Sequence, residues 1–252
     1  EDKPNPPDDM LAVEEPLRLD RLREALPPSR PLSLPLPLRG GRWLKREEAI
    51  MGTSISVELW ADDARTGAAA CAAVMGEMHR IDRRMSPHKA DSELSRINRE
   101  AGERAVPVSE EMFGLLERAQ QFAALSGGAF DITYAAVGRL YDYRAGVRPD
   151  AAALEAARGA VGWQYLRLDP KARTVRFGKP GMCIDLGGFA KGHAVDNAIT
   201  LLQNLGIRHA YVAAGGDSRV LGDRRGRPWS VAIRDPRRAG AAAAVLPLED
   251  TA

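Results

Sequence analysis

The feature that most constrains the fold is the stretch Gly181–Asp196, whose sequence is GMCIDLGGFAKGHAVD. Its beginning, Met182–Leu186, is apolar apart from Asp185 and is typical of a short strand. The pair Gly187–Gly188 predicts a turn. Small and apolar residues then recur at helical spacing as far as Leu205. The sequence therefore predicts a strand, a glycine turn and a helix in direct succession.

A second strand with glycines beyond its end follows the predicted helix. Gly206 is a residue typical of a helix stop, and Tyr211–Ala214 reads as a strand that runs into Gly215–Gly216. We therefore expect a strand–helix–strand crossover. Glycine turns of this kind let ligand phosphates approach backbone N–H groups at a helix N-terminus. The stretch contains neither GxxxxGK[ST] nor GxGxxG, so it is not one of the common nucleotide loops.

A lysine in the first turn of the predicted helix has two interpretations. Lys191 opposes the helix dipole there, at a cost of about 0.3–1 kcal/mol. A solvated lysine tolerates this cost, whereas an anionic ligand held between Lys191 and the helix end would reverse its sign. The residues alone leave both interpretations open.

The composition bounds the class of protein. The chain has 252 residues, of which 44% are hydrophobic, and this is enough for one sizeable core. Its 36 basic and 34 acidic residues indicate no nucleic-acid partner. Cys71 and Cys183 make no metal or redox spacing and are expected to be buried thiols. No apolar run is long enough for a transmembrane segment.

The prolines divide the chain. Residues 1–41 hold nine of the seventeen prolines, and they predict an extended arm with a weak amphipathic helix over Leu17–Leu26. We expect residues 42–252 to form one domain. Its fold class is expected to be α+β, with mixed sheets flanked by helices.

Capping residues mark the helices of this domain. Asp62 or Asp63 is expected to cap a long helix that reaches about Arg84, and Asp91 or Ser92 a short one. Two further helices are expected to begin after Ser109 and after Asp150. The apolar face of the helix after Ser109 is expected to carry Met112, Leu116, Ala119, Phe122 and Ala123.

Alternating residues mark the strands. Ile55, Val57 and Leu59 alternate with polar residues and predict a half-buried strand. Two hairpins are expected, one pairing 165–168 with 174–177 and the other pairing 220–221 with 229–233. A further strand is expected from Leu246 to Leu248.

Three other positions have ordinary structural interpretations. Met51, before Gly52, reads as a core methionine, and His88 reads as a solvated loop residue. The string Ala129–Phe130–Asp131 reads as the entry to a strand with a turn aspartate. The residues alone favour these interpretations for Met51 and His88.

A family resemblance adds to this reading. The string DLGGFAKGHAVD at Asp185–Asp196 resembles the central motif of the ApbE-like flavin transferases, the FAD:protein FMN transferases. The strings IMGT at Ile50–Thr53, DSELSRIN at Asp91–Asn98 and GAFDIT at Gly128–Thr133 are similar to other family motifs, in the same order. The resemblance runs from about Ile50 to the C-terminus and implies the ApbE-like flavin transferase fold.

The resemblance implies an enzyme that splits the FAD pyrophosphate. FMN passes through a phosphoester bond to a Ser or Thr of a partner flavoprotein, and AMP leaves. Such a transfer requires charge neutralisation and alignment, which Mg²⁺ supplies as a Lewis acid. By motif position, the backbone carbonyl of Gly188 is implied as a metal ligand, since Mg²⁺ favours oxygen ligands and keeps several waters.

The resemblance also implies roles for individual side chains. Asp185 and Lys191 are the implied catalytic residues, and both also bind the cofactor: Asp185 accepts its hydrogen bonds and Lys191 pairs with its oxygens. Met51 is implied to pack on the flavin ring, where a polarizable thioether suits an aromatic face. His88 stands where the family commonly has an aromatic residue. The implied flavin site is completed by Ala129, Phe130 and Asp131.

Two other functions stay open at this point. Water in place of the acceptor hydroxyl would make the chain an FAD pyrophosphatase that releases FMN and AMP. A non-catalytic flavin-binding or delivery protein is the third hypothesis, because the sequence stops before family segments that supply an Asp and a Thr to the metal. The resemblance implies a periplasmic or cell-envelope setting.

Overall fold

The computed structural model describes residues 40–142 and 145–252. These residues belong to a compact unit that begins at Arg39. The predicted helix over Leu17–Leu26 lies outside the described residues, as does nearly all of the predicted arm.

The largest sheet has four antiparallel strands in the order β1–β2–β6–β7. Its first two strands, β1 (Arg42–Ile50) and β2 (Thr53–Ala61), form a hairpin with a two-residue turn at Met51–Gly52. Alternate residues of β2 are buried, as the sequence predicts. The sheet is completed by β6 (Ala210–Ala214) and β7 (Asp217–Leu221).

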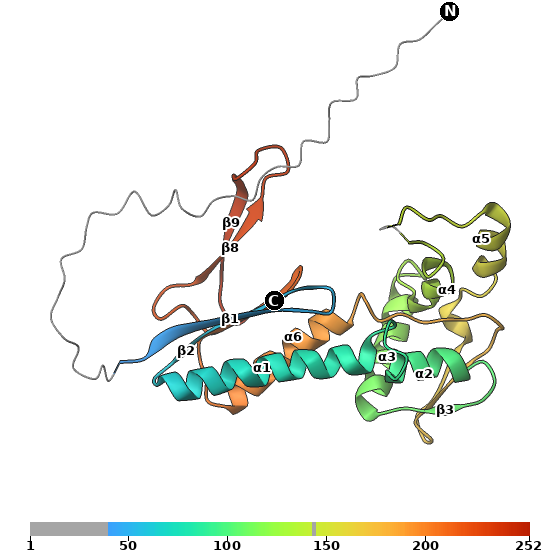
Figure 1. Ribbon diagram of the computed structural model, residues 1–252, viewed down its shortest axis with the longest axis horizontal. Coiled ribbons are helices and arrows are strands. Elements are labelled where there is room, and N and C mark those ends of the chain that lie inside the picture. The colour runs from blue at the N-terminus through green and yellow to red at the C-terminus, as the bar shows by residue number, and fades with distance from the viewer. Residues whose placement is uncertain (1–39, 143–144) are drawn as a thin grey trace, which may run out of the picture. The chain divides into compact units, whose positions relative to one another are not determined.

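Two long helices cover this sheet, and Figure 1 shows them lying together along it. The first, α1 (Ala64–Met85), begins after Asp63, whose Oδ1 accepts a hydrogen bond of 2.8 Å from the Thr66 amide. The second, α6 (Ala190–Asn204), ends before Gly206, which has a φ of +78°. Both ends agree with the sequence prediction. The core lies between these helices and the sheet.

The remaining helices surround a smaller sheet, β3–β5–β4. The predicted caps are confirmed, with Ser92 as the cap of the short helix: Ser92, Ser109 and Asp150 each accept a hydrogen bond from a first-turn amide. The elements are α2 (Glu93–Glu100), β3 (Val106–Pro107), α3 (Glu110–Leu125), η2 (Ile132–Tyr134), α4 (Ala135–Gly138), α5 (Ala151–Arg158), η3 (Trp163–Tyr165), β4 (Leu166–Asp169) and β5 (Thr174–Phe177).

The prediction for the apolar face of α3 is wrong at one residue. Phe122 is 46% exposed, whereas the other four residues of that face are buried. The ring of Phe122 packs edge-on against the ring of Phe189, with centroids 5.8 Å apart. Contact with the residue that precedes α6 therefore replaces burial in the core.

The second predicted hairpin is also wrong. Strand β7 pairs with β6, and β8 (Trp229–Arg234) pairs with β9 (Ala242–Leu248). The reason is the turn between β6 and β7, where Gly215 has a φ of +65° and joins the two strands directly. The hairpin of β4 and β5 is confirmed.

The predicted strand at Met182–Leu186 does not form. Its backbone is paired by a side chain instead of a neighbouring strand: the Asn98 amide donates to the Ile184 carbonyl at 2.9 Å and accepts from the Ile184 amide at 2.9 Å. The predicted crossover therefore lacks its first strand. The α+β class is confirmed, and the described sheets are antiparallel rather than mixed because no crossover joins parallel strands.

Two further expectations concern the cysteines and the membrane. Cys71 is buried and Cys183 is half-buried, neither forms a disulfide, and burial raises the pKa of both thiols. Among residues 40–142 and 145–252, no helix has the length and apolar character needed to cross a membrane.

Candidate functional site

Four of the predicted site residues line one cleft of about 760 Å³. Met51 comes from the β1–β2 turn, His88 from the loop after α1, and Asp185 and Lys191 from either side of the glycine pair. We call this space the α6 cleft, because the first turn of α6 forms part of its wall. The fold thus brings together residues that are up to 140 positions apart in sequence (51 to 191).

Asp185 is held by its backbone and keeps one oxygen available. Its amide donates to the Ile132 carbonyl at 3.0 Å, and its Oδ1 accepts from the Gly187 amide at 3.1 Å. Within the described part of the chain, Oδ2 accepts no hydrogen bond. The carboxylate is therefore rigidly placed and can accept a hydrogen bond from a ligand in the cleft.

The first turn of α6 has an open, electropositive end. Phe189, the residue at the N-cap position, provides no side-chain hydrogen bond, and the amides of Phe189 and Ala190 both donate to the Leu186 carbonyl. The amides of Lys191 and Gly192 have no acceptor among the residues described here. Free N–H groups and the helix dipole favour an anion at this point.

Lys191 has one weak ion-pair partner among the residues that the structure describes. Its Nζ lies 3.6 Å from Oδ2 of Asp217, and the two side chains are 36% and 48% exposed. An exposed pair at this distance contributes at most about 1 kcal/mol to stability. The Lys191 ammonium can therefore exchange Asp217 for a ligand oxygen at little cost.

The glycine pair forms the predicted turn without a left-handed backbone. Gly187 and Gly188 lie in a turn, and neither has a positive φ. A Cβ on Gly188 would meet the ring of Phe130 at 3.5 Å, which is ordinary van der Waals contact. The Gly188 carbonyl accepts no hydrogen bond from the described residues.

Met51 lies at the rim of the cleft with an unusual backbone. Its φ is +54° and that of Gly52 is +70°, as a two-residue hairpin turn of the primed type requires. A non-glycine residue in this region costs about 1 kcal/mol. The Met51 side chain is half-buried and packs against the core, and His88 is exposed.

Ala129, Phe130 and Asp131 lie beside the α6 cleft and not among its lining residues. The expected strand entry here is wrong, because Asp131 caps η2. Its Oδ1 accepts from the amide and hydroxyl of Thr133 at 2.8 and 2.7 Å, and its Oδ2 accepts from the Trp163 amide at 3.0 Å. The Asp131 carboxylate thus joins two loops.

Phe130 links this motif to α6. Its ring lies 5.3 Å, between centroids, from the ring of Phe189, the residue that precedes α6. The motif at 129–131 therefore supports the turn that carries Gly188. The structure gives it a positioning role.

Residues that the sequence reasoning missed also surround the cleft. Arg139 and Tyr141 line it, and neither belongs to a motif that would have marked it. Asn98 is the last residue of the DSELSRIN string, and its pairing with Ile184 fixes the segment that carries Asp185. The sequence did offer one indication of this role: Asn98 directly follows the apolar Ile97, so its polar side chain lies beside the core.

A group of polar and charged side chains that hydrogen-bond to one another lies further along α6, and we call it the polar junction. It joins Glu77 and Arg80 of α1, Glu111 of α3, and His193 and Asn197 of α6. Arg80 donates two hydrogen bonds of 2.6 Å to Glu111 and bonds of 2.7 and 2.8 Å to Glu77. These hydrogen bonds lower the pKa of Glu111 to about 2 and also lower that of Glu77.

The oxygen donors of the α6 cleft fit a magnesium ion better than a zinc ion. No group of three or more His, Cys, Asp or Glu side chains is placed to hold a metal within residues 40–142 and 145–252. Mg²⁺ commonly takes one or two protein oxygens and completes its shell with water and ligand phosphates. The Asp185 carboxylate, which lines the cleft, and the Gly188 carbonyl, in the turn next to it, are donors of this kind.

Comparison with known proteins identifies the family of the chain. The sequence profile of the ApbE family matches residues 51–252. The FAD:protein FMN transferases of Klebsiella pneumoniae and Treponema pallidum are each 32% identical to it, over 193 and 223 residues. These alignments cover 74% and 80% of this chain but 55% and 61% of the relatives, so the chain spans little more than half of their length.

A solved structure agrees with the sequence matches. The crystal structure of the ApbE protein from Thermotoga maritima superposes with a TM-score of 0.76 and 29% identity, covering 83% of this chain and 68% of that protein. The α+β architecture described above is thus the architecture of that protein. On the profile match, the sequence relatives and the shared fold, the chain belongs to the ApbE family.

Proposed function

We propose that this chain carries the FAD site of a Mg²⁺-dependent FAD:protein FMN transferase. The observation that carries the proposal is the meeting of Asp185, Lys191 and the open end of α6 in one cleft. The names of its relatives support this activity, since they are FAD:protein FMN transferases. A periplasmic or cell-envelope location is part of the same proposal and rests on family resemblance.

The charges at the start of α6 suit a pyrophosphate. The Lys191 ammonium and the amides of Lys191 and Gly192 are donors for its oxygens, and Asp185 Oδ2 is an acceptor for a hydroxyl or N–H of the cofactor. Met51 and His88 line the cleft beside them. Their side chains are proposed to contact the flavin, through a thioether on an aromatic face and through a stacked imidazole.

Transfer needs a nucleophile from outside the described residues. The acceptor's Ser or Thr oxygen forms a bond to the FMN phosphorus while the bond from that phosphorus to the AMP oxygen breaks. The hydroxyl proton passes to solvent water, and AMP carries away the electron pair of the broken bond. The Gly188 carbonyl and Asp185 would hold Mg²⁺, which would supply neutralisation of the phosphate charge. The chain's own contribution is alignment, through the fixed Asp185 and Lys191.

The test is an FAD titration with and without Mg²⁺, followed by product analysis. The chain is expected to bind FAD more tightly with Mg²⁺ and, given a Thr-containing acceptor peptide, to give FMN-labelled peptide and AMP by mass spectrometry. Free FMN and AMP in equal amounts would instead identify an FAD pyrophosphatase. Intact bound FAD would identify a flavin-binding or delivery protein. Absence of FAD binding with or without Mg²⁺ overturns the proposal altogether.

A further inference from the structure

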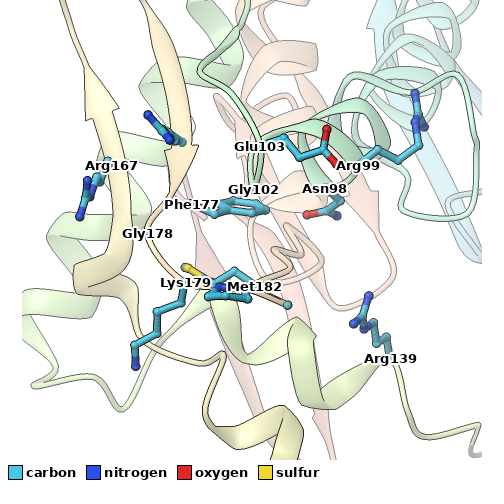
Figure 2. A pocket seen from close by; sticks show the side chains of 13 residues that line it. Asn98, Arg99, Gly102, Glu103, Arg139, Arg167, Phe177, Gly178, Lys179 and Met182 are labelled. Atoms are coloured by element: carbon cyan, nitrogen blue, oxygen red, sulfur yellow. The ribbon is translucent and has the colours of Figure 1, made fainter.

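A second cleft, of about 590 Å³, lies next to the α6 cleft. We call it the basic cleft, because five cationic side chains and one carboxylate, Glu103, line it among the residues that the structure describes. Figure 2 shows labelled members of this set around the Phe177 ring and the Met182 side chain. The five cations are Arg99, Arg139, Arg167, Arg176 and Lys179.

The protein leaves most of this charge unneutralised. Among the residues described, Arg139, Arg167 and Arg176 form no ion pair. Arg99 donates to the Ala90 carbonyl at 2.6 Å, and Lys179 donates to the Gly159 carbonyl at 3.2 Å. Lys179 also lies over the Tyr165 ring, 3.9 Å from its centroid. None of these partners carries a negative charge, so the positive charge of the cleft remains available to an anion.

Two of the arginines stand directly opposite each other. Arg167 of β4 and Arg176 of β5 are partners in the antiparallel register. Like charges in this arrangement destabilise a strand pair, by up to about 1 kcal/mol, when nothing lies between them. The small sheet gains nothing from this pair, whereas a bound carboxylate would turn the repulsion into two attractions.

The lining favours an acidic polypeptide over a nucleic acid. The aromatic ring in the cleft, Phe177, is buried, and no exposed aromatic residue lines the cleft to stack on a base. Stacking platforms of that kind are the usual means of holding single-stranded nucleic acid. Guanidinium groups instead match carboxylates through paired hydrogen bonds.

The position of the cleft connects it to the proposed reaction. Arg139 lines both clefts, and the segment 181–187 contributes Gly181 and Met182 to one and Asp185 and Gly187 to the other. The two clefts therefore adjoin at Arg139 and at this segment. An acceptor chain that brings a hydroxyl to FAD needs a docking surface in such a position.

We propose that the basic cleft docks an acidic segment of the acceptor protein and thereby guides its Ser or Thr to the α6 cleft. The inference rests on the proposed transferase function, because it takes the partner to be the acceptor. Binding in the cleft is electrostatic, so it weakens as salt rises.

The test uses a fluorescein-labelled oligoglutamate peptide and its anisotropy in a titration with the whole chain. The double variant Arg167→Glu/Arg176→Glu is expected to weaken peptide binding at least about tenfold at low salt, since each change replaces an attraction by a repulsion. Arg167→Gln/Arg176→Gln removes the charges without repulsion and is expected to have a smaller effect in the same direction. Both variants should retain the wild-type circular dichroism spectrum.

A matched control makes the same charge change elsewhere. Arg65→Glu/Arg237→Glu alters two exposed arginines that lie outside both clefts, and we expect peptide affinity to change by less than about twofold. An equal loss in this control would show general charge attraction and overturn the inference. Displacement of the peptide by tripolyphosphate at far lower concentration than by free peptide would identify a phosphate site and also overturn it.

An FAD titration of the same proteins separates the inference from the proposed function. The variants at Arg167 and Arg176 are expected to bind FAD as the wild type does, because neither residue lines the α6 cleft. If the wild type binds the peptide but does not bind FAD, the proposed function is refuted and the docking cleft remains. FAD binding without peptide binding refutes the docking cleft alone.

Discussion

Two parts of the same helix, α6, treat charge in opposite ways. In its first turn, the one ion-pair partner of Lys191 in the described part of the chain is Asp217, at 3.6 Å. Further along, His193 and Asn197 bond to Glu111 at 2.8 and 3.2 Å within the polar junction, where Arg80 already bonds to the same carboxylate. Charged side chains with several close protein partners hold helices together, whereas a charged side chain with one weak partner is available to a ligand.

The contrast has a physical basis in burial. The two cations, Arg80 and Lys191, are similarly exposed, at 33% and 36%. The carboxylates differ, because Glu111 is 20% exposed and Asp217 is 48% exposed, so water screens the pair at Glu111 less. The polar junction also joins three helices, α1, α3 and α6, which come from distant parts of the chain. We therefore expect its loss to affect stability, and loss of Lys191 to affect ligand binding.

The largest effect is expected from Arg80→Met. The change keeps most of the side-chain volume and leaves Glu77 and Glu111 without their shared guanidinium. We expect the free energy of unfolding to fall by about 2 kcal/mol, below the usual cost of breaking a buried pair because the site is partly exposed. Urea denaturation followed by circular dichroism measures this.

The matched control for this variant is Arg83→Met on the same helix, where the side chain is exposed. It should change the free energy of unfolding by less than about 0.5 kcal/mol. If both substitutions cost the same, the polar junction is no stronger than the surface of α1 and the comparison fails.

The second effect is a dependence of stability on acid. Hydrogen bonds from Arg80 hold the pKa of Glu111 at about 2, below its ordinary value of 4.5. The unfolded chain therefore binds a proton at this group more readily than the folded chain does. The stabilisation is complete above about pH 5 and is lost as the pH falls towards 2.

Urea denaturation at several pH values in this range tests the sign. The wild type should lose stability more steeply than Glu111→Gln, which has no proton to gain at this position. Glu110→Gln is the control, because the neighbouring Glu110 is exposed and pairs loosely with Arg173 at 3.8 Å. Equal slopes in the wild type and Glu111→Gln would contradict the assignment.

The sequence predicted the local parts of the fold. Asp63, Ser109 and Asp150 each cap the expected helix, because a side-chain acceptor beside three free amides is a purely local signal. The alternation in β2 and the stop at Gly206 are local in the same sense. The prediction that failed was strand pairing: β7 pairs with β6 and β8 pairs with β9. The hydrogen-bonding edge of one strand can pair with many other strands, so the local sequence does not decide its partner.

For the candidate site too, local motifs were predictable from the sequence and contacts between distant residues were not. Motifs identified Met51, His88, Asp185 and Lys191, and the fold places all four in one cleft. The failed strand at Met182–Leu186 shows the limit: an apolar run indicates burial, but only the structure shows that Asn98 replaces a strand partner. The basic cleft was invisible because its cations are scattered between residues 99 and 179.

The smallest effect on stability, and the sharpest on the ligand, is expected from Lys191→Ala. An exposed pair at 3.6 Å contributes little to folding, and removal of a cation from the first turn of α6 relieves its conflict with the helix dipole, so the free energy of unfolding should change by less than about 0.5 kcal/mol. FAD affinity should fall about tenfold, because the pyrophosphate loses a charge-assisted partner. Lys171→Ala, in the exposed turn between β4 and β5, is the control for both measurements. A large loss of stability with unchanged FAD affinity would make Lys191 a structural residue like those of the polar junction, and the two parts of α6 compared above would then no longer differ.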